Sequence, residues 1–261
     1  MIIELFGPPG VGKTTFAYAL AARLRERGCP VDLVLSYRPS EAPRTFCAQH
    51  AARLGIAAAL RRLARPMVES LAAVGHSASA CEVHAIAELM RVLVPRNVIW
   101  SLRLRQYMLR LFRNRRSAEL AAGITLFDQG FVQAVYTLAL QARAADRGRI
   151  GLALDAVPLP DLLVRIDAPR ETVGARLVER RNRQGRIERL FDLDVATNLG
   201  SMWIFEQLYE LLQTRGRRVI CAASANRQSL YESIAEVEAI AIRTPAEWPV
   251  VSAGEKAGVD W

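Results

Sequence analysis

The chain has 261 residues, 51% of them hydrophobic, which fits one large α/β domain or a domain with an insertion better than two independent domains. Its formal net charge is +9, and arginine supplies nearly all of the positive charge, because Lys13 and Lys256 are the two lysines among 35 basic residues. We interpret this charge mainly as a solvated surface and partly as the lining of a phosphate site, and we do not expect nucleic acid as a partner.

Nothing in the sequence indicates a membrane or an export signal. No run of about 18 uncharged apolar residues occurs, and the N-terminal residues lack the basic segment of a secretory signal. Widely spaced cysteines without a CxxC pair are typical of free thiols in a reducing compartment; they are Cys29, Cys47, Cys81 and Cys221. We therefore expect a cytoplasmic protein that is not bound to a membrane.

The first part of the chain begins with a strand, a helix and a second strand. Residues 2–6 form a short apolar run that stops at Gly7, as a buried parallel strand does. Apolar residues at helical spacing then follow over residues 14–27, and residues 31–37 are predicted as the second strand. From about residue 44 to residue 118 the pattern is helical throughout, which predicts a long helical insertion.

The second half of the chain continues the alternation. Strands are predicted at residues 124–127, 162–166 and 218–221, and helices at residues 131–145, 170–181, 196–214 and 229–242. Strands that alternate with helices indicate an α/β fold with a parallel sheet covered on both faces. Residues 244–261 contain Pro and Gly in mixed polarity and are predicted as a loose tail behind a domain that spans residues 1–243.

A phosphate-binding loop follows the first predicted strand. The P-loop pattern G-x-x-x-x-G-K-[ST] is matched at every fixed position by Gly7, Pro8, Pro9, Gly10, Val11, Gly12, Lys13 and Thr14. The backbone N–H groups of such a loop surround a phosphate, and the start of the next helix adds its partial positive charge. We expect Lys13 to reach the β- and γ-phosphates and Thr14 to be a Mg²⁺ ligand, and we include Thr15 among the nucleotide-binding residues.

An acidic residue, Asp128, comes directly after the predicted strand at residues 124–127. A carboxylate at the carboxyl end of a parallel strand can hold Mg²⁺ or accept a proton from an attacking hydroxyl group. The alternative is a structural role as the N-cap of the following helix. We favour the functional role, because a cap does not need a buried strand in front of it.

Arginines gather after the predicted strand at residues 162–166. They are Arg176, Arg180, Arg181, Arg183, Arg186 and Arg189. With Gly185 as a hinge, residues 180–190 are predicted as a lid whose guanidinium groups stabilise the transferred phosphoryl group, and Arg180 and Arg183 are the candidates for catalysis. A solvated basic helix face is the alternative. Arg38 and Arg44, beyond the second strand, mark either a substrate-binding loop or a surface turn.

The order of these segments resembles the thymidylate kinase and deoxynucleoside kinase group of P-loop kinases. The resemblance covers residues 1–243, and its specific matches are the P-loop, the strand that ends in Asp128-Gln129-Gly130, and residues 163–172 (LVRIDAPRET) with the arginines behind them. It implies the P-loop NTPase fold with five parallel strands in the order 2-3-1-4-5, ATP and Mg²⁺ as cofactors, and an adenine-contacting loop at residues 222–226.

The chain departs from that group in two places. Gln129 stands where the group has an arginine after the aspartate, and the helical stretch at residues 44–118 is longer than the group's pattern. Residues 37–40 (YRPS) match the group's Arg-Glu-Pro segment only faintly.

The sequence therefore predicts a small-molecule kinase that transfers the γ-phosphoryl group of ATP to a nucleotide, a nucleoside or a similar acceptor. The alternative is a P-loop NTPase that acts as a regulatory or switch protein without a small-molecule acceptor. A GTPase is disfavoured because residues 223–226 (ASAN) do not match the Asn-Lys-x-Asp pattern that reads guanine. A homodimer is compatible with all of these functions.

Overall fold

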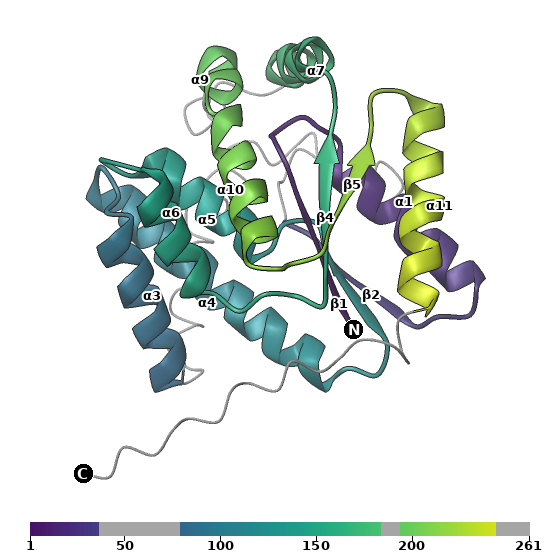
Figure 1. Ribbon diagram of the computed structural model, residues 1–261, viewed down its shortest axis with the longest axis horizontal. Coiled ribbons are helices and arrows are strands. Elements are labelled where there is room, and N and C mark those ends of the chain that lie inside the picture. The colour runs from purple at the N-terminus through teal and green to yellow at the C-terminus, as the bar shows by residue number, and fades with distance from the viewer. Residues whose placement is uncertain (37–78, 184–193, 244–261) are drawn as a thin grey trace, which may run out of the picture.

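The computed structural model describes residues 1–36, 79–183 and 194–243, and in this part of the chain one parallel sheet lies between two layers of helices (Figure 1). The strands are β1 (Ile2–Phe6), β2 (Val31–Val34), β3 (Ile124–Phe127), β4 (Leu162–Asp167) and β5 (Val219–Ala223). Their order is β2-β3-β1-β4-β5, and every neighbouring pair is parallel. The predicted fold class and strand order are confirmed.

The helices cover both faces of the sheet. They are α1 (Lys13–Glu26), α3 (Ala80–Val92), α4 (Val98–Leu120), α5 (Phe131–Gln141), α6 (Arg147–Asp155), α7 (Arg170–Arg183), α9 (Val195–Gly200), α10 (Met202–Thr214) and α11 (Arg227–Arg243). Helices α1 and α11 pack together on one face, and α4, α5, α6 and α10 lie on the other (Figure 1).

The central strand β1 divides the core because its side chains alternate between the two faces. Ile3 and Leu5 belong to the apolar cluster under α1 and α11, whereas Ile2 and Phe6 belong to the cluster under α4, α5 and α10. Glu4 shares the second face and is 2% exposed. A buried carboxylate in the middle of the central strand therefore points at the layer that contains α5.

Several helices begin where a polar side chain accepts a hydrogen bond from the first turn. Ser79 and Glu82 form a capping box at the start of α3, and Asn97, Asp146 and Asp194 cap α4, α6 and α9. The cap at Asp146 explains one difference from the sequence analysis. The helix predicted over residues 131–145 ends at Gln141, and a separate helix, α6, follows it.

Two other predicted elements differ from the structure by more than two residues or by a break. The helix predicted over residues 196–214 is divided at Ser201, whose hydroxyl group donates to Asn198 O at 2.8 Å and so competes for a carbonyl of the preceding turn. The strand predicted over residues 31–37 ends at Val34. Helices α3 and α4 confirm the helical pattern over residues 80–92 and 98–120, with a break between them.

Three predicted segments lie wholly or partly outside the described residues: the insertion up to residue 78, the lid at residues 184–190 and the tail at residues 244–261. In the residues that are described, every helix is too short or too polar to cross a lipid bilayer.

Candidate functional site

The P-loop lies between β1 and α1, and its glycines are required by its backbone. Gly7, Gly10 and Gly12 have φ angles of +149°, +81° and +104°, which L side chains rarely adopt. A Cβ atom on Gly7 would also stand 2.4 Å from the carbonyl oxygen of Ile166 on the neighbouring strand β4. The loop therefore packs directly against β4, and its backbone has a fixed conformation.

The lysine of the loop is buried. Lys13 is 7% exposed, and its Nζ donates hydrogen bonds to Gly7 O at 2.6 Å and to Pro8 O at 3.0 Å. The N-cap of α1 is Gly12, which brings no side chain to the first turn. Backbone N–H groups at such a helix start can bind an anion, and Lys13 lies beside them.

Asp128 brings three strand ends together. Its side chain is fully buried, and Oδ2 accepts a hydrogen bond from Thr14 Oγ1 at 3.0 Å. Residue Ser36, just past β2, donates its N–H to Oδ1 at 2.6 Å and its hydroxyl group to Oδ2 at 3.1 Å. The carboxylate thus joins the P-loop, the end of β2 and the end of β3.

These contacts bear on the structural alternative for Asp128, the N-cap of the following helix. Helix α5 has Gly130 as its N-cap without a side-chain cap, so Asp128 does not cap it. A carboxylate and the hydroxyl groups of Thr14 and Ser36 form a set of hard oxygen atoms, the ligand type that Mg²⁺ prefers. The residues present therefore fit a magnesium site.

Sequence reasoning missed Ser36. The second strand is predicted over residues 31–37, which places Ser36 inside the strand and not beyond its carboxyl end. The register pairs Val34 with Phe127, which places Ser36 beside Asp128. The signal in the sequence was a hydroxyl residue directly after an apolar run, next to a second strand that ends in an acid.

Two buried residues behind the P-loop, Glu4 and Gln133, are also not indicated by the sequence pattern. Glu4 accepts a hydrogen bond from Val132 N at 2.6 Å, and burial raises the pKa of its carboxyl group to about 7, against the opposing effect of backbone hydrogen bonds at the start of α5. On the next residue of α5, Gln133 Oε1 accepts a hydrogen bond from Gly7 N at 3.2 Å.

Among the predicted lid arginines, Arg176 binds carbonyl groups next to the P-loop. Its guanidinium group donates to Val11 O at 3.0 Å and to Ser224 O at 2.8 Å, and it lies 3.4 Å from Ala225 O. Ser224 also donates its hydroxyl group to Val11 O. Arg176 thus joins α7, the P-loop and the loop after β5, which is the loop expected to contact adenine.

The other predicted arginines are placed less completely. Arg180 lies on α7 with a buried Nε atom, and Arg181 lies on the same helix and is exposed. Arg183 ends α7, and its side chain is outside the description. The remaining predicted residues, Arg38, Arg44, Arg186 and Arg189, also lie outside the described residues.

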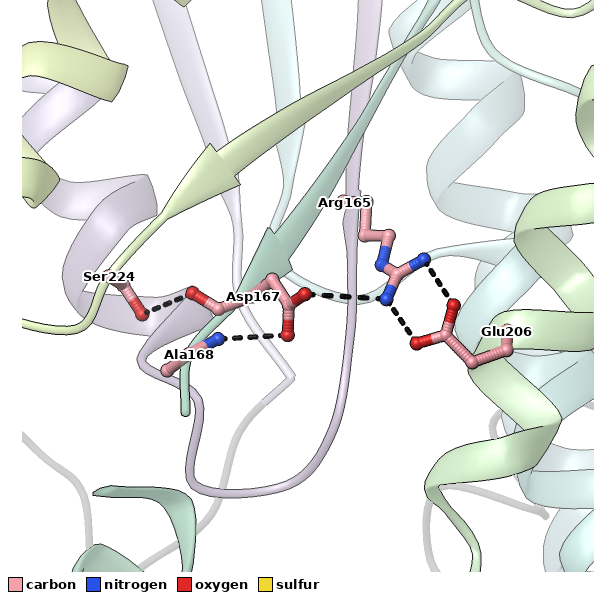
Figure 2. A network of polar contacts seen from close by, with 5 residues as sticks. All are labelled: Arg165, Asp167, Ala168, Glu206 and Ser224. Carbon is pink, nitrogen blue, oxygen red and sulfur yellow. Dashed lines mark hydrogen bonds and ion pairs between the residues drawn. The ribbon is translucent and has the colours of Figure 1, made fainter. Parts of the chain in front are cut away.

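A second polar network fixes the carboxyl end of β4 (Figure 2). Arg165 binds Glu206 of α10 through both terminal nitrogens, at 2.5 and 3.0 Å, and approaches Asp167 at 3.4 Å. Burial opposes the charge of Arg165, but Glu206 and Asp167 outweigh it, so the pKa of the guanidinium group lies above its ordinary value. Ser224 N donates to Asp167 O at 2.8 Å and ties β5 to the same end.

No family model matches the sequence, and a search of the curated proteins finds no relative. Among solved structures, the chain is similar to deoxyadenosine kinase from M. mycoides. The form with bound dCTP is 12% identical over 92% of this chain and 100% of that chain, with a TM-score of 0.47. The form with the products dCMP and dCDP is 12% identical over 91% and 96% of the two chains (TM-score 0.45), and the form with bound dATP is 13% identical over 91% and 98% (TM-score 0.48). A likeness at this level does not bear on function.

Proposed function

We propose that the protein is an ATP-dependent phosphotransferase that requires Mg²⁺ and acts on a small-molecule acceptor of the nucleoside or nucleotide type. The observation that carries the proposal is the contact between Thr14 and Asp128 at 3.0 Å, directly beside the buried Lys13. A phosphate-binding loop alone serves many classes of protein. A loop hydroxyl group paired with a strand-end carboxylate adds the oxygen ligands that a nucleotide-bound magnesium ion requires.

Each residue has a distinct part in the proposed reaction. The backbone N–H groups of the loop and Lys13 bind and orient the phosphate chain, and Thr14 and Asp128 hold the metal ion. When bound, Mg²⁺ neutralises charge on the β- and γ-phosphates. Asp128 also offers a carboxylate that can accept the proton of an attacking hydroxyl group. Arg180 and Arg183 remain the proposed partners of the transferred phosphoryl group.

The acceptor class rests on the resemblance noted in the sequence. Arg38 and Arg44 are the proposed acceptor-binding residues, since guanidinium groups bind phosphate oxygens in a bidentate manner. A screen of acceptors is therefore the first assay.

A second candidate is a nucleotide-dependent switch that has no small-molecule acceptor. The observation that favours it is Gln129, which follows Asp128 and offers an uncharged amide where the resembling kinases have an arginine. A site with one fewer fixed positive charge stabilises the transferred phosphoryl group less. In this case the nucleotide would bind and turn over slowly, and its effect would be transmitted to a protein partner.

Phosphoryl transfer from ATP and Mg²⁺ should be measured across nucleoside monophosphates, nucleosides and sugars. We expect one acceptor class to be phosphorylated, and we expect Lys13→Ala and Asp128→Asn each to lower the rate by about 100-fold or more. Asp32→Asn removes the charge of an exposed aspartate on β2 and is the matched control, with an unchanged rate.

The outcomes separate the candidates. ATP binding that depends on Lys13, without transfer to any acceptor, would favour the switch. Absence of ATP binding by the wild-type protein would contradict both proposals.

A further inference from the structure

Two hydrogen bonds in opposite directions join β1 to α5 behind the P-loop. On β1, Glu4 accepts the bond from Val132 N, at 2.6 Å. Three residues later, Gly7 N donates to Gln133 Oε1 at 3.2 Å. The acceptors come once from the strand and once from the helix, so each element fixes the other at two consecutive points.

Both side chains are buried near the point where the backbone pairing of β1 with β3 ends. Glu4 is 2% exposed and Gln133 is 4% exposed. The pairing of β1 with β3 ends at Glu4, opposite Phe127. Beyond that register β1 continues to Phe6 along β4, whereas β3 ends at Phe127, so side-chain hydrogen bonds join the P-loop side to the segment after β3.

Gly130 shows how closely the turn is fitted to Glu4. A Cβ atom on Gly130 would lie 2.3 Å from the carboxyl carbon of Glu4. This contact leaves no room for a side chain at residue 130, and it indicates that the turn after Asp128 closes directly on the Glu4 carboxyl group.

The charged neighbour of this pair comes from α4. Arg115 lines the same small cavity as Glu4 and Gly130. Its own bonds go elsewhere, to Glu119 at 2.8 Å and to Leu159 O at 3.1 Å. Within the described residues, the hydrogen bonds of Glu4 are with the start of α5, and Arg115 adds a favourable charge nearby.

We propose that Glu4 and Gln133 are positioning residues that hold the Asp128 turn at a fixed distance from the P-loop, so that nucleotide and Mg²⁺ strengthen each other's binding. This inference rests on the proposed function. Neither residue is among the proposed phosphate-binding residues. Thr14, at the end of the P-loop, and Asp128, before the turn, are the proposed metal ligands, and the pair sets the separation of the two segments that carry them.

The role predicts an effect on coupling and not on nucleotide binding as such. ATP without metal is held by the P-loop and does not need Asp128, whereas ATP with Mg²⁺ needs both segments in register. A residue that only supports the fold would weaken both modes of binding by the same factor. A positioning residue changes the ratio between them, which is a coupling quantity.

ATP binding should be measured by titration calorimetry in EDTA and in Mg²⁺. The quantity to compare among variants is the dissociation constant in EDTA divided by the dissociation constant in Mg²⁺. We expect Gln133→Leu, which removes the acceptor of Gly7 N, to lower this ratio by about 5-fold or more, and to leave binding in EDTA within about 2-fold of the wild type. Gln133→Glu keeps an acceptor oxygen at the same reach and should retain most of the ratio. Gln141→Leu makes the same change at another buried glutamine of α5 and should leave both constants unchanged.

Each result has a clear meaning. Equal weakening in EDTA and in Mg²⁺ for Gln133→Leu, or an unchanged ratio, would overturn the positioning role while the proposed function stands. If Gln133→Leu does not fold, Glu4→Ala removes the other acceptor and must show the same loss of ratio. A wild-type protein that binds no ATP under either condition would overturn the proposed function, and the positioning role with it.

Discussion

Glu4 is a carboxyl group that the fold surrounds on all sides, and its replacement by glutamine tests that environment directly. Burial raises its pKa to about 7 in the folded protein, whereas the unfolded chain releases the same proton near 4.5. Between these two values the folded protein retains a proton that the unfolded chain has already lost. The free energy of unfolding of the wild-type protein should therefore fall as the pH rises from 5 to 8, and level off above the folded pKa.

The size of the effect follows from the same two values. At about 1.36 kcal/mol per pKa unit, the difference corresponds to about 3 kcal/mol of stability lost in total, of which about 2 kcal/mol is lost between pH 5 and pH 8. Glutamine has no proton to release, and its amide oxygen can still accept the hydrogen bond from Val132 N. Glu4→Gln should thus exceed the wild type by about 1 kcal/mol at pH 5 and by about 3 kcal/mol at pH 8.

Urea denaturation followed by circular dichroism at a series of pH values, at constant ionic strength, measures this difference. Glu26→Gln changes an exposed glutamate of α1 and serves as the control that should keep the wild-type profile. Asp155 and Asp194 have pKa values lowered by hydrogen bonds, to Arg215 and to Thr197 respectively, so the stability that they add is lost only in acid, below the range tested. A wild-type stability that stays constant or rises from pH 5 to pH 8 would refute the reasoning, and so would a Glu4→Gln variant with the wild-type slope.

Three further changes test other contacts. Gly130→Ala should destabilise the protein by about 1–3 kcal/mol, because the new methyl group meets the Glu4 carboxyl group. In a double-mutant cycle with Glu4→Ala, the two losses of stability should not add. Additive losses would contradict the contact. Arg176→Ala should lower the free energy of unfolding by about 1–3 kcal/mol, because Val11 O and the loop after β5 lose a charged donor. Arg176→Lys should restore little of this stability, since an ammonium group lacks the planar fork of the guanidinium group. Thermal denaturation compares the two variants, and full recovery by lysine would argue against a role for the fork. Ser36→Ala should weaken Mg²⁺-dependent ATP binding by about 5-fold, as expected for the loss of one hydrogen bond to the carboxylate, with binding in EDTA as the internal control; equal losses in both conditions would mean that Ser36 only supports the fold.

The sheet could be predicted from the sequence because its strands are short, mainly apolar runs between helical segments, although the end of β2 was not marked by the residue that follows it. The P-loop was equally predictable, since its glycines are required by positive φ angles and its lysine and threonine by phosphate chemistry. Strand order came from family resemblance and not from the strands themselves. Parallel strands carry no signal that names their neighbours, so the order needed outside knowledge.

The missed features depend on contacts between distant segments. Helix α6 is short, and it is defined by its cap at Asp146 and by packing against α10, neither of which stands out as a long periodic pattern. Glu4 lies within a short apolar run, and no local pattern marks it, because its partner on α5 lies 128 residues away in the sequence. The break at Ser201 has the same origin, since its hydroxyl group also contacts Tyr136 of α5 at 2.8 Å.

Lys13 already has two carbonyl partners within its own loop, at Gly7 and Pro8. A phosphate that takes this ammonium group must replace both bonds, so the interaction is an exchange and contributes only the difference between the two arrangements. A small anion that engages the lysine alone gains little from such an exchange. A polyphosphate that also takes the backbone N–H groups of the loop gains on every contact. For the proposed function, this exchange would favour a nucleotide, which takes many contacts at once, over a simple anion that takes one.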